Sequence, residues 1–178
     1  MHWTGVVFTL LAGVPPDGAA QLAKVERLMP ALSRLAADPQ IVEAVRAQNA
    51  RGVSLDTVRE RDEAWQATSQ LTPLKKEVLG SACSKLLVRH QQALGRRLAE
   101  SFVMDKLGGL VGATRRPSDY WQGDEAKFQV PFTRGVALTE KPFFDDSSLT
   151  YVVQVSLPIR DAGRVIGAVT FSLSLLDL

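Results

Sequence analysis

Two consecutive stretches near the C-terminus, Thr150–Asp161 (TYVVQVSLPIRD) and Val165–Leu175 (VIGAVTFSLSL), alternate between apolar and polar residues. In the first stretch every second residue from Tyr151 to Ile159 is apolar. Alternation with a period of two is typical of β-strands with two different faces. The short connection Asp161-Ala-Gly163 favours a tight turn. The sequence therefore predicts a β-hairpin at the centre of a sheet.

Shorter strand patterns precede this hairpin. An apolar run at 101–107 (SFVMDKL) ends at Gly108-Gly109, and 110–114 (LVGAT) reads as the returning strand. The segment from Pro117 to about Phe132 is rich in polar residues, aromatic residues and helix breakers, so we expect a loop or a short helix there. Strand residues resume between Val136 and Phe144.

The first half of the sequence has the periodicity of helices. Asp38-Pro39 and Thr72-Pro73 each combine an N-cap residue with proline at the first helical position, and Ser54 can cap a further helix. We expect the helix that begins at Pro73 to run to about Gly95. Before Asp38, apolar residues recur at spacings of three and four and share one helical face: Leu22, Val25, Leu28, Met29, Leu32 and Leu35.

Helices followed by strands predict an α+β fold with an antiparallel sheet. We expect a helical region at 21–97 and a sheet region at 98–178 that together form a single domain. One sheet face would pack on helices. The polar and aromatic connection would cover the other face, with a pocket beneath it.

Composition and charge narrow the classes of function. The 178 residues are 46% hydrophobic and 22% charged, as in a globular chain that buries a core. The net charge is only +2, and no basic stripe with interleaved aromatic residues occurs, so nucleic-acid binding is not expected. Cys83 is the single cysteine and cannot form an intramolecular disulfide. Its expected role is that of a small buried apolar residue.

The N-terminal residues predict export. The apolar run Val6–Val14 ends at Pro15-Pro16, and the small residues Gly18-Ala-Ala20 follow. This pattern is typical of a secretory signal, and the run is shorter than a membrane span requires. We therefore expect a signal peptide at 1–20, with cleavage before Gln21, and a periplasmic protein.

Several segments, in order along the chain, resemble the Cache (PDC) family of bacterial extracytoplasmic sensor domains. The Ser118–Phe128 segment (SDYWQGDEAKF) carries the most specific part of the resemblance. The other segments are Asp38–Asn49, Asp62–Trp65, Phe102–Gly108, Val111–Ala113, Phe144–Ser147, Val155–Asp161 and Gly163–Val169.

The resemblance implies a PAS-like five-stranded antiparallel sheet with a long N-terminal helix. It also implies a role in signal transduction through the binding of a small extracellular solute, such as a carboxylate or an amino acid. Most members of the family belong to sensor kinases or chemoreceptors, so a membrane receptor of that kind is the expected partner. Because the sequence ends after the last predicted strand, we expect the free-standing periplasmic type.

The connection that walls the ligand pocket in this family contains Asp119, Tyr120 and Trp121 here. Two aromatic rings can enclose the apolar body of a solute, and a carboxylate can accept from an ammonium or hydroxyl group. The alternative is that the rings pack inside a lid and Asp119 caps a short helix. Arg115 and Lys127 could hold a ligand carboxylate, or they could be solvated surface charges.

Asp145 and Tyr151 stand at the start of the hairpin, where the resemblance implies a sheet region that faces the pocket. Asp145 could accept from a ligand amine or hydroxyl group. The alternative is a turn, because the sequence Asp-Asp-Ser-Ser favours a turn without any ligand.

Three further expectations concern the class of function. The sequence has no catalytic motif and predicts neither an enzyme nor a cofactor. One alternative function is an interaction module that keeps the fold, fills the pocket with side chains and forms a homodimer through its N-terminal helix. The other is binding of a divalent cation by carboxylates of Asp119, Asp124, Glu125, Asp145 and Asp146.

Overall fold

The computed structural model describes residues 19–145 and 149–178, so most of the expected signal segment lies outside the described residues. The helices are α1 (Ala19–Ala36), α2 (Pro39–Ala50), α3 (Leu55–Gln66), α4 (Pro73–Leu79), α5 (Ala82–Leu94) and α6 (Ala126–Gln129), with short turns η1 (Gly95–Arg97) and η2 (Val130–Arg134). The strands are β1 (Leu98–Met104), β2 (Leu110–Ala113), β3 (Leu138–Thr139), β4 (Phe143–Asp145), β5 (Thr150–Asp161) and β6 (Arg164–Ser174).

All six described strands form one antiparallel sheet with the order β2-β1-β6-β5-β3. Strand β4 pairs with β5 as well, at Thr150–Val152, while β3 pairs with β5 at Val155 and Ser156. Strand β6 pairs with one edge of β5, so β3 and β4 both pair with the other edge, one after the other along it. The expected α+β fold with a five-stranded antiparallel sheet is therefore confirmed, except that two short strands, β3 and β4, form the edge next to β5.

The central hairpin also forms as predicted. Strands β5 and β6 pair from Val152 opposite Ser174 to Asp161 opposite Arg164. The turn between them places Ala162 and Gly163 at φ values of 47° and 82°. Glycine adopts this left-handed region without steric cost, which is why the sequence carries it at this position.

The predicted helix starts are confirmed by their caps. The carboxylate of Asp38 accepts from the backbone N–H of Gln40 at 2.8 Å, and the hydroxyl of Ser54 accepts from that of Thr57 at 3.1 Å. The single long helix expected after Thr72 is wrong, because the chain breaks between α4 and α5. Ser81 caps α5 by accepting from the N–H of Ser84 at 3.1 Å.

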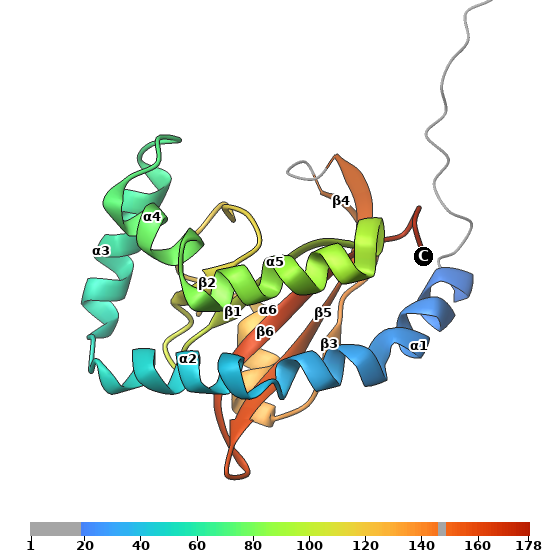
Figure 1. Ribbon diagram of the computed structural model, residues 1–178, viewed down its shortest axis with the longest axis horizontal. Helices are drawn as coiled ribbons and strands as arrows, with labels where there is room; N and C mark the ends of the chain where they lie inside the picture. Colours follow the sequence, from blue (N-terminus) through green and yellow to red (C-terminus); the bar gives the residue numbers. More distant parts are fainter. Residues whose placement is uncertain (1–18, 146–148) are drawn as a thin grey trace, which may run out of the picture.

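Helices α1, α2 and α5 cover one face of the sheet, and α6 with η2 lies against the other (Figure 1). The predicted apolar stripe of α1 packs on β5 and β6 of the same chain, where Val25 and Leu32 are fully buried. Helices α3 and α4 flank the β2 end of the sheet. None of the described helices is both long enough and apolar enough to cross a bilayer.

The face of the central hairpin that α6 and η2 cover is polar, although it is buried. Gln154 donates to the hydroxyl of Ser172 at 3.1 Å, and the hydroxyls of Ser156 and Thr170 lie 2.9 Å apart. All four side chains are buried. These are the polar positions of the alternating pattern, and they form a buried polar floor rather than a surface in water.

Candidate ligand-binding site

A cavity of about 400 Å³ lies beside this polar floor, between the sheet and the connection that follows β2. A cavity was expected in this place, and its volume is in the range typical of small-molecule sites. Its walls come from β1, β4, β5, the connection and α6. The lining residues are Glu100, Phe102, Pro117, Ser118, Gln122, Lys127, Phe143, Phe144, Asp145 and Gln154.

Glu100 on β1 is the most unusual group of this cavity. Its side chain lines the cavity, the residue is only 6% exposed, and its Oε1 atom has no hydrogen-bond partner among the described residues. Burial raises the pKa of Glu100 to about 7; Arg115 and Lys127 counteract this rise, and Asp145 adds to it. Near neutral pH this carboxyl group therefore exists in both protonation states.

Gln122 presents a second unpartnered acceptor. The residue is 1% exposed, and its Nε2 atom donates to the backbone carbonyl of Asp119 at 3.1 Å. Its Oε1 atom has no hydrogen-bond partner in the part of the chain that the structure describes. Buried polar atoms of folded proteins are nearly always paired, so two unpaired acceptors in one cavity indicate a place for a hydrogen-bond donor.

Lys127 on α6 brings positive charge to the cavity. Its ammonium group lies 2.9 Å from the carboxylate of Glu125 and 5.8 Å from the ring centroid of Phe102 on β1. The Lys127 side chain is 17% exposed, so its charge is only partly screened by water. The cavity therefore contains both an acidic and a basic wall.

Strand β4 forms the outer wall. Phe143 and Phe144 line the cavity and are 38% and 47% exposed, and Asp145 follows them. The ring of Phe144 meets that of Tyr151 edge to face, with centroids 5.3 Å apart. Because Tyr151 belongs to the other face of β5, the Phe144 ring turns toward that face, and the half-exposed ring of Phe143 is the one that can bury apolar surface when a ligand enters the cavity.

Helix α3 holds the connection in place. One carboxylate oxygen of Asp62 accepts from the backbone N–H groups of Tyr120 at 2.7 Å and Trp121 at 3.0 Å. One turn further along α3, the indole N–H of Trp65 donates to the carbonyl of Pro117 at 2.9 Å. The sequence analysis did not assign this role to Asp62 or Trp65, although their spacing of three residues places them on one helical face.

The structure brings two of the predicted site residues, Lys127 and Asp145, to the cavity. The Arg115 side chain lines a neighbouring groove, but its charge acts on the pKa of Glu100. Asp119 accepts from the hydroxyl of Ser118 at 2.6 Å and does not line the cavity. Tyr151 belongs to the opposite face of β5, because it packs against the core beneath the helices.

Tyr120 and Trp121, the two aromatic residues predicted to enclose the ligand, do not line this cavity. The ring of Tyr120 lies 5.8 Å from that of Trp65, and its hydroxyl accepts from Arg61 at 3.4 Å. The indole N–H of Trp121 donates to the carbonyl of Leu107 at 2.8 Å. Both side chains thus anchor the connection and are absent from the cavity lining, which matches the alternative that they pack inside the lid.

Of the ten lining residues only Lys127 and Asp145 were predicted, and the eight that were missed include three buried polar residues, Glu100, Gln122 and Gln154. Glu100 had a detectable signal, because it is the single charged residue of the strand Leu98–Met104. Gln154 had one as well, since it carries the single amide side chain of the alternating hairpin. Gln122 had none, because glutamine beside Gly123 is equally suited to a turn.

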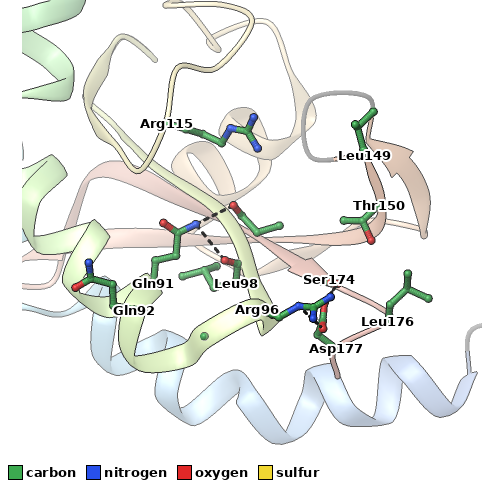
Figure 2. Close-up of a pocket in the computed structure, with 12 residues that line it drawn as sticks. Gln91, Gln92, Arg96, Leu98, Arg115, Leu149, Thr150, Ser174, Leu176 and Asp177 are labelled. Atoms are coloured by element: carbon green, nitrogen blue, oxygen red, sulfur yellow. Dashed lines mark hydrogen bonds and ion pairs between the residues drawn. The ribbon is translucent and has the colours of Figure 1, made fainter.

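A second, larger groove of about 630 Å³ lies at the end of the sheet near the described C-terminus (Figure 2). Several of its polar groups already have partners: Gln91 donates to the carbonyls of Leu98 and Ala99, and Arg96 lies 3.1 Å from Asp177. The groove is open, and its apolar residue Leu149 is 76% exposed. We therefore assign the candidate site to the smaller cavity, which has buried and unpartnered polar atoms.

The structure offers no support for the expected group of carboxylate ligands. Among the described residues, no three or more His, Cys, Asp or Glu side chains are placed together to hold a metal ion. Asp146, which belonged to that expectation, lies outside the described residues.

A scan against protein-family models matches no family, and a search of the curated proteins finds no match. The solved structures include similar chains. The sensor domain of the V. cholerae histidine kinase DctB is 12% identical with a TM-score of 0.48, over 89% of this chain and 55% of that chain. The ligand-binding domain of the Pseudomonas aeruginosa PAO1 amino acid chemoreceptor PctC, in complex with GABA, is 16% identical with a TM-score of 0.47, over 88% of this chain and 58% of that chain.

The ligand-binding domain of the Pseudomonas fluorescens chemoreceptor CtaA, in complex with L-serine, is 15% identical with a TM-score of 0.42, over 85% of this chain and 61% of that chain. This chain therefore spans between half and two thirds of the length of these three domains. The three are a sensor domain of a histidine kinase and ligand-binding domains of two chemoreceptors. At these identities the similarity concerns the path of the chain, and no residue role is carried over by it.

Proposed function

We propose that this chain is a periplasmic sensor domain that binds a small molecule in the cavity between β1, β4, β5 and the Pro117–Lys127 segment. The observation that carries the proposal is a cavity of about 400 Å³ with buried, unpartnered polar atoms in its wall. Those atoms lose hydrogen bonds on folding, and a bound solute would restore them. The expected solute is small and polar, such as an amino acid or a carboxylate.

The proposed signalling role follows from the way the cavity is closed. The connection is held by Asp62 and Trp65 of α3, and β4 is a short strand at the outer edge of the sheet. A ligand that contacts both segments would favour the conformation in which they close on the sheet, as a population shift. A membrane sensor kinase or a chemoreceptor is the proposed recipient of this signal.

A thermal-shift screen of the refolded chain tests the proposal. The panel contains amino acids, small carboxylates, amines, purines and divalent cations. A ligand at about 100 times its dissociation constant stabilises the fold by about 2.7 kcal/mol, which is a shift of several degrees for a domain of this size. A stabilising solute supports the sensor role, whereas a flat response over the whole panel favours the interaction module.

The variant Phe143→Ala tests whether a stabilising solute binds in this cavity. Phe143 contributes a 38% exposed ring to the outer wall, so its removal takes away apolar contact with little loss of core packing. We expect about tenfold weaker binding, which corresponds to about 1.4 kcal/mol, measured by calorimetric titration.

The matched control is Leu71→Ala, which truncates an exposed apolar residue outside the cavity and should leave the affinity unchanged. Equal affinities of Phe143→Ala and wild type would place the binding site elsewhere on the molecule.

A further inference from the structure

The unpartnered polar atoms of the cavity are both hydrogen-bond acceptors. Glu100 and Gln122 are 6% and 1% exposed, both line the cavity, and the Oε1 atom of each has no partner among the described residues. The two residues come from different elements, β1 and the connection. A buried acceptor without a donor is unfavourable, so this part of the cavity is suited to a ligand group that donates.

The donors of the cavity wall, in contrast, each have at least one partner. The ammonium group of Lys127 lies 2.9 Å from the carboxylate of Glu125. The amide nitrogen of Gln154 donates to Ser172 at 3.1 Å, and that of Gln122 donates to the carbonyl of Asp119 at 3.1 Å. A ligand that brought only acceptors could use the N–H groups that remain on Lys127, Gln154 and Gln122, but it would leave the acceptors of Glu100 and Gln122 unpaired.

We propose that Glu100 and Gln122 select a ligand that carries a protonated primary amine. This inference rests on the proposed function, because it concerns the same cavity. An ammonium group has three N–H donors, enough to serve both acceptors. Its charge also forms a short, charge-assisted hydrogen bond with the ionised carboxylate of Glu100. A carboxylate-only ligand would instead bring negative charge to a cavity that contains Glu100 and Asp145.

The same geometry couples amine binding to proton release. Three charged groups act on Glu100: Arg115 from the segment after β2, Lys127 from α6 and Asp145 from β4. Their effects partly cancel, and burial raises the pKa of Glu100 to about 7. When an ammonium group binds beside the protonated carboxyl, the carboxyl proton leaves to solvent and an ammonium–carboxylate pair remains. Amine affinity therefore rises with pH through the pKa of Glu100.

Matched probe series test the preference for an amine. One series is L-alanine, ethylamine and propionate; the other is 5-aminopentanoate, pentylamine and pentanoate. We expect the amine-bearing members to bind at least about tenfold more tightly than the member without an amine, measured by calorimetric titration. Binding of propionate or pentanoate in preference to the amines would overturn the inference while leaving the sensor function intact. A lack of binding by every probe and every solute of the screen would remove the proposed function itself.

The pH dependence tests the role of Glu100 directly. From about one pH unit below 7 to about one unit above it, amine affinity should rise about tenfold in the wild type, and at pH 7 about half a proton should be released per ligand. The variant Glu100→Gln keeps the shape of the side chain and an acceptor but has no titrating proton. We expect weaker amine binding with neither pH dependence nor proton release, measured in two buffers of different ionisation enthalpy.

Two further variants separate this role from a merely structural one. Gln122→Met removes the second acceptor, so it should weaken amine binding but retain the pH dependence. His90→Gln changes an imidazole side chain that lies beside Asp38, on the helix-covered side of the sheet. His90→Gln should bind as the wild type does. Retention of the full pH dependence by Glu100→Gln would show that another group titrates and would overturn the inference.

Discussion

At the scale of single residues, the candidate site depends on side chains that hold the connection as well as on those that line the cavity. Asp62 uses one carboxylate oxygen to accept from two consecutive backbone N–H groups, those of Tyr120 and Trp121. Its other oxygen accepts from Gln66 at 2.8 Å. The aromatic side chains of Tyr120 and Trp121 therefore point toward α3 and away from the cavity.

Substitution of Asp62 with alanine would leave the N–H groups of Tyr120 and Trp121 without a partner. A lost partner of a buried backbone group costs about 1–3 kcal/mol, so we expect a decrease of about 2 kcal/mol in the free energy of unfolding. Chemical denaturation measures this difference. Glu63→Ala on the exposed side of the same helix is the control and should change stability by less than about 0.5 kcal/mol. Equal stabilities of the two variants would contradict the role of Asp62.

At the scale of elements, the packing of α2 on the sheet depends on a glycine in β6. A Cβ atom on Gly167 would lie 2.3 Å from the backbone carbonyl oxygen of Met104 in β1 and 2.9 Å from a methyl carbon of Val45 in α2. The absence of a side chain there allows strand β1 and helix α2 to approach β6 closely. The sequence pattern identifies Gly167 only as an interruption of an apolar strand.

The variant Gly167→Ala should therefore be destabilising, although alanine is usually better tolerated in strands. The added methyl group has to displace backbone atoms, and overpacking of this kind costs about 1–3 kcal/mol. The shift of the thermal midpoint reports the loss. Thr139→Ala, at an exposed position of the edge strand β3, serves as the control with an expected change below about 0.5 kcal/mol. A midpoint of Gly167→Ala at or above that of the wild type would show that the sheet has room for the methyl group.

At the scale of the whole molecule, the two faces of the sheet have different tasks. The face beneath α1, α2 and α5 holds the larger apolar core, and such burial is the main source of stability. The other face, beneath α6, η2 and the connection, contains the hydroxyl and amide row of β5 and β6 and the acidic group of Glu100. Stability therefore comes mainly from one face, while the other face retains polar groups for recognition.

The burial of Glu100 on the polar face lowers the free energy of unfolding by an amount that depends on pH. Glu100 has a pKa of about 7 in the folded chain, against a reference value of 4.5 for the unfolded chain. Between these two values the folded chain keeps the proton that the unfolded chain has lost, so stability falls as the pH rises through this window. The full loss is reached above pH 7 and amounts to about 3 kcal/mol.

The variant Glu100→Gln should remove this loss. We expect it to be more stable than the wild type by up to about 3 kcal/mol at pH values above about 8, and to match the wild type near pH 4. Denaturation curves of both proteins over this pH range provide the test, because their difference isolates Glu100 from all other titrating groups. A difference that does not change with pH would mean that Glu100 titrates normally in the folded state.

Features that depend on near neighbours in the chain were predictable. The helix starts at Pro39, Leu55 and Pro73 follow from caps within three residues, and the hairpin follows from alternation around a short turn. The break between α4 and α5 has a local signal, the Ser81 cap, which was missed because apolar residues continue at helical spacing across it. Ser84 also stabilises the break, because its hydroxyl donates to the carbonyl of Val78 at 2.6 Å and accepts from the N–H of Ala113 in β2 at 2.8 Å. The second contact joins residues that are 29 positions apart.

The sequence by itself therefore determined the order of the elements, the α+β class and the segment that covers the sheet, since caps and periodicity act over a few residues. Only the tertiary structure decided which side chains of that segment reach the cavity. Tyr120 and Trp121 face α3 because Asp62, 58 and 59 positions earlier, binds their backbone. Glu100 becomes a functional candidate because the folded sheet buries it beside a cavity and leaves its carboxyl oxygen unpaired, a state that no local pattern can specify.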